Sequence, residues 1–311
     1  MRSPVLFLVF NRPETTAMVF EHIRAAMPPK LYVAADGPRS SHKGDLEACS
    51  QVRRIVSQID WPCQVKTLFQ EKNLGCKLGV STGISWFFDH ETEGIILEDD
   101  VLPVASFFPY CDELLETYRY DDRVRMISGS NLVASKFECQ DSYFFSNIPL
   151  IWGWASWRRS WQQYDVDIRK WRKWDYDGGL KKIFPSSPLV TSYWRDAFNR
   201  VVKGELNTWD YQLIFSQWCY GGLTIIPAHN LTNNLGYGVN ATHTSQNKPK
   251  CLLDSPPTEL TFPLIHPSNI QTNKGIDQLI FQHVHEINLI GFIRRQFRPI
   301  KKLMKLLSLK K

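Results

Sequence analysis

The chain has 311 residues, of which 43% are hydrophobic and 22% are charged. A chain of this length and composition can bury a sizeable core, which excludes disordered, collagen-like and disulfide-rich miniprotein classes. One large domain or two fused domains are expected. The seven cysteines are scattered and never spaced as C-x-x-C, so the sequence indicates neither a disulfide framework nor a zinc site. They are typical of buried thiols in a reducing compartment.

The positive charge is concentrated in the last part of the sequence. The formal net charge is +6, and residues 291–311 hold eight Arg and Lys residues and no acid, so the rest of the chain carries −2. Nothing in that remainder requires a nucleic-acid partner. The apolar run Val5 to Phe10 is too short for a signal peptide or a membrane span. We therefore expect a cytoplasmic protein.

The first hundred residues alternate short β-branched runs with longer amphipathic segments. This alternation is typical of an α/β fold, a mostly parallel sheet flanked by helices. The expected strands are Val5–Phe10, Leu31–Ala35, Gln64–Phe69 and Gly94–Leu97. The expected helices are Pro13–Ala26, Lys43–Ser57 and Lys77–Phe88.

The pattern changes beyond residue 101. Further helices are expected at Ala105–Tyr118, Pro188–Val202 and Thr208–Tyr220, and further strands at Val124–Ser128 and Leu223–Pro227. Six tryptophans lie between residues 152 and 174, a density that fits either a core of large rings or a carbohydrate platform. Residues 245–275 are rich in Pro, Ser, Asn and Lys and predict an extended connection.

Residues 291–311 combine their positive charge with an apolar periodicity. Apolar residues recur there at intervals of four and three, at Ile293, Phe297, Ile300, Met304 and Leu307. The pattern predicts a basic amphipathic tail helix, kinked or restarted at Pro299, that lies on an anionic membrane surface. A helix packed on the body, or charge that serves only solubility, is the alternative.

Three consecutive acids, Glu98, Asp99 and Asp100, follow the fourth expected strand. Like charges placed so close together cost stability unless a cation binds among them. Mg²⁺ and Mn²⁺ prefer carboxylate oxygens and commonly hold substrate phosphates in their other positions. The segment therefore favours a divalent cation site at this strand end, with a solvated acidic turn as the alternative.

The triplet also resembles a known motif. With Phe107 and Phe108 on the following helix, it is similar to the D-x-D-type metal motif of GT-A (Rossmann-like) fold glycosyltransferases, and in particular to the E-D-D motif of the N-acetylglucosaminyltransferase I family. The resemblance runs in order over roughly residues 4 to 244. It implies a nucleotide-sugar donor, Mn²⁺ or Mg²⁺ on Asp100, Glu98 and Asp99 near the donor ribose and sugar, and an inverting mechanism.

Earlier segments resemble the nucleotide-binding turns of the same family. Asn11 and Arg12 occupy the place of its first strand end, whose arginine embraces the nucleotide. Asp36 matches the aspartate that reads the uracil ring. Asn73 and Lys77 match the segment that reaches the base and diphosphate. The resemblance thus implies that these residues bind the donor, which we expect to be UDP-linked.

The expected catalytic base is Asp210. An inverting transfer needs one base to deprotonate the acceptor hydroxyl. The pair Trp209-Asp210 resembles the family's W-D-D segment with its catalytic aspartate, although Tyr211 replaces the second aspartate. The alternative for Asp210 is a carboxylate at a helix start, stabilised by the dipole. Glu205 is the second candidate base.

Two later residues complete the predicted site. His243, in a loop rich in Gly and Asn, is expected to touch the donor diphosphate or the metal. The segment Trp152–Trp157, of which we select Trp154 as the site residue, is expected to lie between the donor and acceptor sites, as the family's G-W segment does. The chain then divides into a nucleotide-sugar-binding half (1–130), an acceptor and catalytic half (131–245), a connection with a helix (246–290) and the basic tail (291–311).

The expected function is a metal-dependent, inverting hexosyl- or N-acetylhexosaminyltransferase that acts on a glycan or lipid-linked acceptor in polysaccharide biosynthesis, at the inner face of the cytoplasmic membrane. The family's N-terminal membrane anchor is not found, which favours a bacterial-type relative. The G-x-G-T-R loop of sugar-phosphate nucleotidyltransferases is missing near the first strand. A metal-dependent phosphohydrolase or nucleotidyltransferase, and a non-enzymatic sugar- or membrane-binding protein, are the alternatives.

Overall fold

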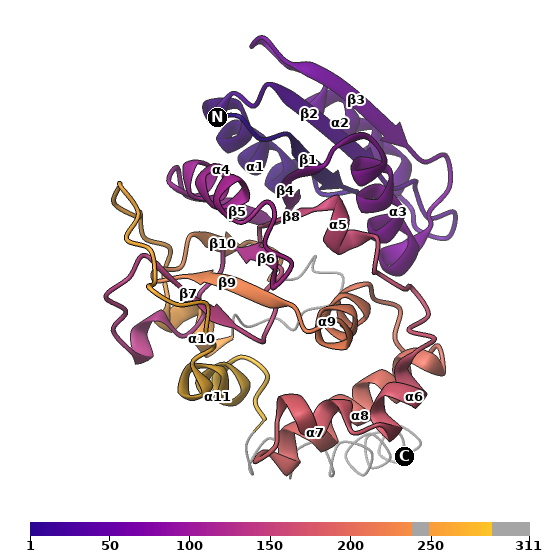
Figure 1. Cartoon of the computed structure of the whole chain (residues 1–311). Coiled ribbons are helices and arrows are strands. Elements are labelled where there is room, and N and C mark those ends of the chain that lie inside the picture. The colour runs from indigo at the N-terminus through magenta and orange to yellow at the C-terminus, as the bar shows by residue number, and fades with distance from the viewer. Residues whose placement is uncertain (238–248, 288–311) are drawn as a thin grey trace, which may run out of the picture.

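The computed structural model describes residues 1–237 and 249–287 and is built on one large sheet (Figure 1). Its eight strands lie in the order β3-β2-β1-β4-β8-β6-β9-β7. Strands β1 to β4 are mutually parallel, as are β6 and β9, whereas β8 and β7 pair antiparallel with their neighbours. The strands are β1 (Val5–Val9), β2 (Lys30–Ala35), β3 (Gln64–Phe69), β4 (Glu93–Glu98), β6 (Val124–Ser128), β7 (Tyr143–Ser146), β8 (Trp154–Trp157) and β9 (Leu223–Pro227). The predicted α/β fold, a mostly parallel sheet flanked by helices, is confirmed.

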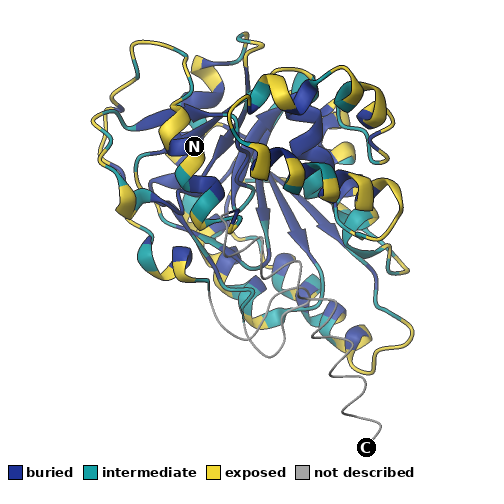
Figure 2. Ribbon diagram, turned by 90° about the horizontal axis from the view of Figure 1, so that it is seen from below, coloured by how far each residue is buried: buried dark blue, intermediate teal, exposed yellow. Residues whose placement is uncertain are grey.

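Helices cover both faces of the first half of this sheet. Along β1, Val5, Phe7 and Val9 belong to one core, and Leu6 and Leu8 to another, because successive side chains of a strand point to opposite faces. The first core is covered by α1 (Pro13–Ala26), α2 (Asp45–Val56) and α4 (Phe107–Thr117), and the second by α3 (Gly75–His90), α5 (Arg158–Trp161) and α9 (Asp210–Cys219). Burial on both faces explains the continuous apolar sequence of β1 (Figure 2).

A further core lies beyond the sheet's second half and is rich in aromatic rings. Trp171, Trp194 and Trp218 are buried there, and the rings of Trp194 and Trp218 meet edge to face with centroids 4.9 Å apart. The surrounding helices are α6 (Trp171–Tyr176), α7 (Gly179–Ile183), α8 (Pro188–Val202), α9 and α11 (Lys274–His283). The core interpretation of the tryptophan-dense segment therefore holds for Trp171.

A small two-stranded sheet brings a late part of the chain to the acidic triplet. Strand β5 (Val101–Pro103) pairs antiparallel with β10 (Thr232–Asn234), and the backbone N–H of Leu235 donates to the carbonyl of Asp100 over 2.7 Å. Strands of three residues carry too little periodicity to be predicted. The remaining elements are a 3₁₀ turn (Ala134–Lys136) and α10 (Lys250–Asp254).

Most predicted elements agree with the structure. Helices Pro13–Ala26 and Pro188–Val202 have the predicted bounds, as do the strands at 64–69, 124–128 and 223–227. All seven cysteines are free thiols. Within the described ranges, no helix is long and apolar enough to cross a membrane. The tail 291–311 and His243 lie outside the described residues.

Candidate active site

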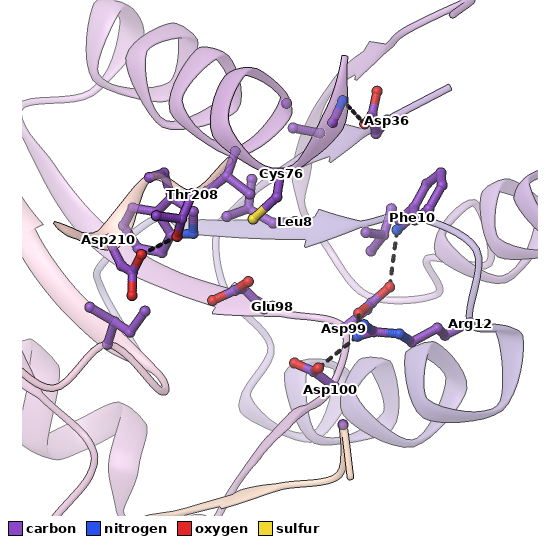
Figure 3. Close-up of a pocket in the computed structure, with 18 of the residues that line it drawn as sticks. Leu8, Phe10, Arg12, Asp36, Cys76, Glu98, Asp99, Asp100, Thr208 and Asp210 are labelled. Atoms are coloured by element: carbon purple, nitrogen blue, oxygen red, sulfur yellow. Dashed lines mark hydrogen bonds and ion pairs between the residues drawn. The ribbon is translucent and has the colours of Figure 1, made fainter. Parts of the chain in front are cut away.

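A cavity of about 510 Å³ opens at the carboxyl ends of β1, β2 and β4, where the amino ends of α3 and α9 also meet (Figure 3). This is the edge of an α/β sheet at which ligands bind. The predicted site residues in its wall are Arg12, Asp36, Asn73, Glu98, Asp99, Asp100 and Asp210. Residues in its wall that sequence reasoning did not select include Phe10, Arg39, Cys76, Asn207 and Thr208. Trp152 and Gly236, which also line it, belong to segments that were expected near the ligand.

The acidic triplet is anchored to the end of β1. Asp99 is 5% exposed and accepts from the backbone N–H of Phe10 and from Nη1 of Arg12, each over 3.0 Å. The same Nη1 lies 2.6 Å from Oδ2 of Asp100. The guanidinium of Arg12 therefore bridges two of the three acids.

Burial changes the protonation of this cluster. It is the main cause that raises the pKa of Glu98 well above its ordinary value, with a smaller contribution from Asp100 and Asp99. Burial also raises the pKa of Asp99, to about 6, against the opposing charge of Arg12. Ionisation of all three carboxylates together therefore has a cost, which an added cation would relieve.

Asp100 is fixed between the first half of the chain and β10. Its carbonyl accepts from Leu235, and a Cβ added to Gly236 would overlap Oδ2 of its side chain. A glycine at 236 therefore allows the backbone to pass close beside this carboxylate.

Asp36 organises the turn between β3 and α3. Oδ1 accepts from the backbone N–H groups of Gly37 and Leu74, both over 2.8 Å, and Oδ2 accepts from Asn73 Nδ2 over 2.9 Å and from the N–H of Gly75 over 3.1 Å. Four donors already occupy this carboxylate. A contact with a base, as the resemblance implies, would require one of these bonds to open.

A buried carboxylate behind the cavity wall holds Arg39, one of the residues that line the cavity. Asp45, at the start of α2, accepts from Arg39 Nε over 2.6 Å and Nη2 over 3.0 Å, and from Asn11 Nδ2 over 2.8 Å. The guanidinium of Arg39 also lies over the ring of Phe10, 5.3 Å from its centroid. Asn11 therefore supports Asp45 from outside the cavity wall, while Arg39 faces the cavity. No sequence signal distinguished Asp45 from an ordinary acid at a helix start.

Lys77 is directed away from the cavity. Its Nζ lies 3.1 Å from Asp167, and its backbone N–H donates to Oδ1 of Asn207 over 3.2 Å. The first turn of α3 is thereby tied to the loop that precedes α9. Asn207 reaches the cavity, and its role depends on a contact between residues 130 positions apart.

Trp154 belongs to the core and does not line the cavity. It is 1% exposed, and its ring stacks on that of Trp209 with centroids 5.9 Å apart and an interplanar angle of 20°. Trp152 lies in the wall instead. Trp154 belongs to β8, which pairs with β4, and its side chain packs in the core on one face of the sheet.

Asp210 begins α9 and lines the cavity, and in Figure 3 it lies on the side of Glu98 that is away from Asp99 and Asp100. The hydroxyl of Thr208 donates to its Oδ1. Helix N-termini favour a negative charge at this position. Tyr211, which stands where the resembling family has a second aspartate, packs its ring on Trp194 in the aromatic core. Glu205 lies outside the cavity wall and pairs with Arg200 at 3.5 Å.

The site suits a divalent cation held by few protein ligands. In the part of the chain that the structure describes, no three His, Cys, Asp or Glu side chains converge to form a metal cage. Carboxylate oxygens are nevertheless the ligands that Mg²⁺ and Mn²⁺ prefer, and such ions often use one or two carboxylates with substrate phosphates and water. Asp100, with its oxygen toward the cavity, would hold the ion, and Asp99 would support it.

Comparisons with known proteins give only distant likenesses. No protein-family model and no curated protein matches the chain. The galactosyltransferase LgtC, solved with donor and acceptor sugar analogues, aligns with 69% of this chain over 70% of its own, at 11% identity and a TM-score of 0.37. HddC from Yersinia pseudotuberculosis aligns with 52% of this chain over 80% of its own, at 8% identity and a TM-score of 0.31. A UTP-bound UGPase from Acinetobacter baumannii aligns with 53% of this chain over 77% of its own, at 10% identity and a TM-score of 0.30. These values are too low to support an activity, so the function has to be inferred from the site.

Proposed function

We propose that this protein is a metal-dependent, inverting glycosyltransferase that moves a sugar from a UDP-linked donor to a glycan or lipid-linked acceptor. One observation carries the proposal: the acidic triplet and Asp210, which come from distant parts of the chain, line one cavity. The triplet, in which Asp99 is buried and Glu98 and Asp100 are half-buried, lies at the end of β4, and Asp210 lies at the start of α9. The cavity of about 510 Å³ is in the size range of small-molecule sites.

The triplet side is suited to the diphosphate of the donor. Asp100 would hold Mn²⁺ or Mg²⁺, which supplies charge compensation for the departing diphosphate. Arg12 is close enough to Asp100 to pair with a phosphate oxygen beside it. Asn73 and Arg39 line the same cavity on the side of β2, where the nucleoside would lie.

Asp210 is suited to proton removal from the acceptor. The Asp210 carboxylate would take the proton of an acceptor hydroxyl while that oxygen attacks the anomeric carbon. The bond from that carbon to the diphosphate oxygen breaks, and its electron pair leaves with the nucleoside diphosphate. Attack from the side opposite the leaving group inverts the configuration of the sugar carbon.

Donor hydrolysis tests this proposal without knowledge of the acceptor. Purified protein is incubated with UDP-, GDP- and TDP-sugars and Mn²⁺, and the release of nucleoside diphosphate and free sugar is followed. We expect slow release from one donor, most readily a UDP-sugar, that stops on chelation of the metal.

A parallel reaction with UTP and sugar 1-phosphates detects the nucleotidyltransferase alternative. Formation of UDP-sugar and pyrophosphate in that reaction, with no donor hydrolysis, would overturn the proposal.

A further inference from the structure

Arg12 lies directly against the carboxylates that would face the divalent cation. Its Nη1 is 2.6 Å from Asp100 Oδ2 and 3.0 Å from Asp99 Oδ1, and its side chain is only 22% exposed. An ion pair this far from bulk water is screened much less than one at the surface. The backbone of Arg12 is fixed, because its carbonyl accepts from Thr16 at the start of α1 over 2.9 Å. The guanidinium of Arg12 can therefore leave Asp100 only by a rotation of the Arg12 side chain.

The guanidinium and a divalent cation need the same carboxylate. Mg²⁺ binds carboxylate oxygens at roughly 2.1 Å, so on either oxygen of Asp100 it would lie close to the Nη1 that contacts Oδ2. The backbone at Gly236 also passes close to Oδ2, which limits how far this carboxylate can turn. Two cations that share one carboxylate repel each other. The guanidinium of Arg12 therefore weakens the binding of a divalent cation to Asp100.

We propose that Arg12 is an exchangeable counter-ion, which holds Asp100 until a nucleoside diphosphate arrives and so makes binding of the divalent cation depend on the nucleotide. This inference rests on the proposed function and deepens it. A diphosphate gives the guanidinium bidentate oxygen partners in place of the carboxylate. It also gives the cation the further oxygen ligands that the described residues do not supply. After the exchange Arg12 pairs with the diphosphate, and the cation pairs with both Asp100 and the diphosphate.

The test measures the binding of Mn²⁺ alone, by calorimetry or by the spectrum of free Mn²⁺, and then repeats the measurement with UDP present. Arg12→Gln removes the competing charge, and Arg12→Lys keeps a positive charge at the same place. Lys66→Gln is the matched control, since it removes one positive charge from an exposed position on β3, away from the cavity wall.

In the wild type, Mn²⁺ alone should bind about tenfold more weakly than Mn²⁺ with UDP, a typical size for coupling between two ligands. Arg12→Gln should bind Mn²⁺ alone about tenfold more tightly than the wild type and lose most of the gain from UDP. Arg12→Lys and Lys66→Gln should behave as the wild type does.

Unchanged Mn²⁺ affinity in a folded Arg12→Gln protein would overturn the inference, as would equal tightening in Lys66→Gln. If Arg12→Gln does not fold, equal Mn²⁺ affinity with and without UDP in the wild type and Arg12→Lys would also overturn it. These results would leave the glycosyltransferase proposal standing. Absence of Mn²⁺ binding in every protein, even with UDP, would overturn both.

Discussion

Five aspartates around the cavity share one side-chain chemistry but differ in their surroundings. Asp36 is held by four donors and Asp45 by two side chains and a backbone N–H, so both serve the local structure. Asp99 is anchored to the backbone of β1, whereas Asp100 and Asp210 present carboxylates to the cavity. The number of fixed donors around a carboxylate, rather than its position in a motif, decides which acids can act on a ligand.

The proposed base can be tested by a change that keeps its shape. Asp210→Asn cannot accept a proton, so sugar transfer should fall by roughly 10²- to 10⁴-fold, the usual contribution of general-base catalysis. Donor affinity should survive, because the proposed nucleotide contacts are made by Arg12, Arg39 and Asn73 and not by Asp210. Initial rates and UDP binding are measured on the same preparation, with Glu205→Gln as a control. Unchanged turnover in Asp210→Asn, or a large loss in the control, would move the base elsewhere.

The sequence allowed Asp100 and Asp210 to be placed in one site, because each follows a clear strand or begins a clear helix. It could not distinguish Trp154 from Trp152, because which ring enters the core depends on the register of β8 against β4. The roles of Arg39 and Asn207 depend on contacts with Asp45 and Lys77 that local sequence does not encode.

At the level of elements, regular periodicity made the long helices and the strands of the first half predictable. The apolar run of β1 and the amphipathic pattern of α1 each reflect burial that repeats along one element. Strands β5 and β10 were missed because each has three residues and is stabilised by its partner. Yet this pairing is what brings Gly236 to Asp100.

The contact between Gly236 and Asp100 predicts a specific effect of one methyl group. Gly236→Ala would place a Cβ on Oδ2 of Asp100 and push the carboxylate from its position. We expect metal-dependent UDP affinity to fall by about tenfold, a loss of roughly 1.4 kcal/mol, while thermal stability changes little. Calorimetric titration of UDP in the presence of Mn²⁺ measures this affinity. Gly275→Ala, at the start of α11, is the control. Equal UDP affinities in the wild type and Gly236→Ala would show that the backbone at Gly236 does not position Asp100.

The start of α2 should make stability depend on pH. The hydrogen bonds from Arg39, opposed by burial, lower the pKa of Asp45 from 3.8 to about 2. The unfolded chain therefore binds more protons between these values, so the stabilisation is complete above about pH 5 and is lost as the pH falls from about 4 to 2. Asp45→Asn should lower the free energy of unfolding at pH 6, and it should lower it by a smaller amount at pH 3. Urea unfolding at both pH values checks this, with Asp60→Asn as an exposed control. A deficit in Asp45→Asn that does not shrink at pH 3 would contradict this account.

In the molecule as a whole, the cavity lies where the sheet of the first half meets the helices of the second. The triplet belongs to β4, Asp210 belongs to α9, and Asn207 ties the loop before α9 to α3. Donor binding and proton removal are thus assigned to segments far apart in sequence that share one cavity. The order of strands and helices in the sequence can indicate where such a cavity lies, but it does not give the long-range contacts, such as that between Asn207 and Lys77, that position its walls.

The basic tail leads to a separate expectation about where the protein acts. The eight cations of residues 291–311 should bind anionic vesicles at low salt and release them as the Debye length shortens to about 8 Å at physiological ionic strength. Vesicle sedimentation measures this, with neutral vesicles as the control. A chain truncated before Gly291 should stay in the supernatant and keep donor hydrolysis. Pelleting of the truncated chain, or loss of its hydrolysis, would assign the tail a structural role.

The most direct test of the central claim is a calorimetric titration of UDP into the wild type and Asp100→Ala, with and without Mn²⁺. We expect the wild type to bind one UDP per chain, more tightly with Mn²⁺. In Asp100→Ala the Mn²⁺ effect should disappear while the protein stays folded, because removal of one acid relieves repulsion in the triplet. A wild type that binds no nucleoside diphosphate, or an Asp100→Ala protein that keeps the full Mn²⁺ effect, would contradict the account.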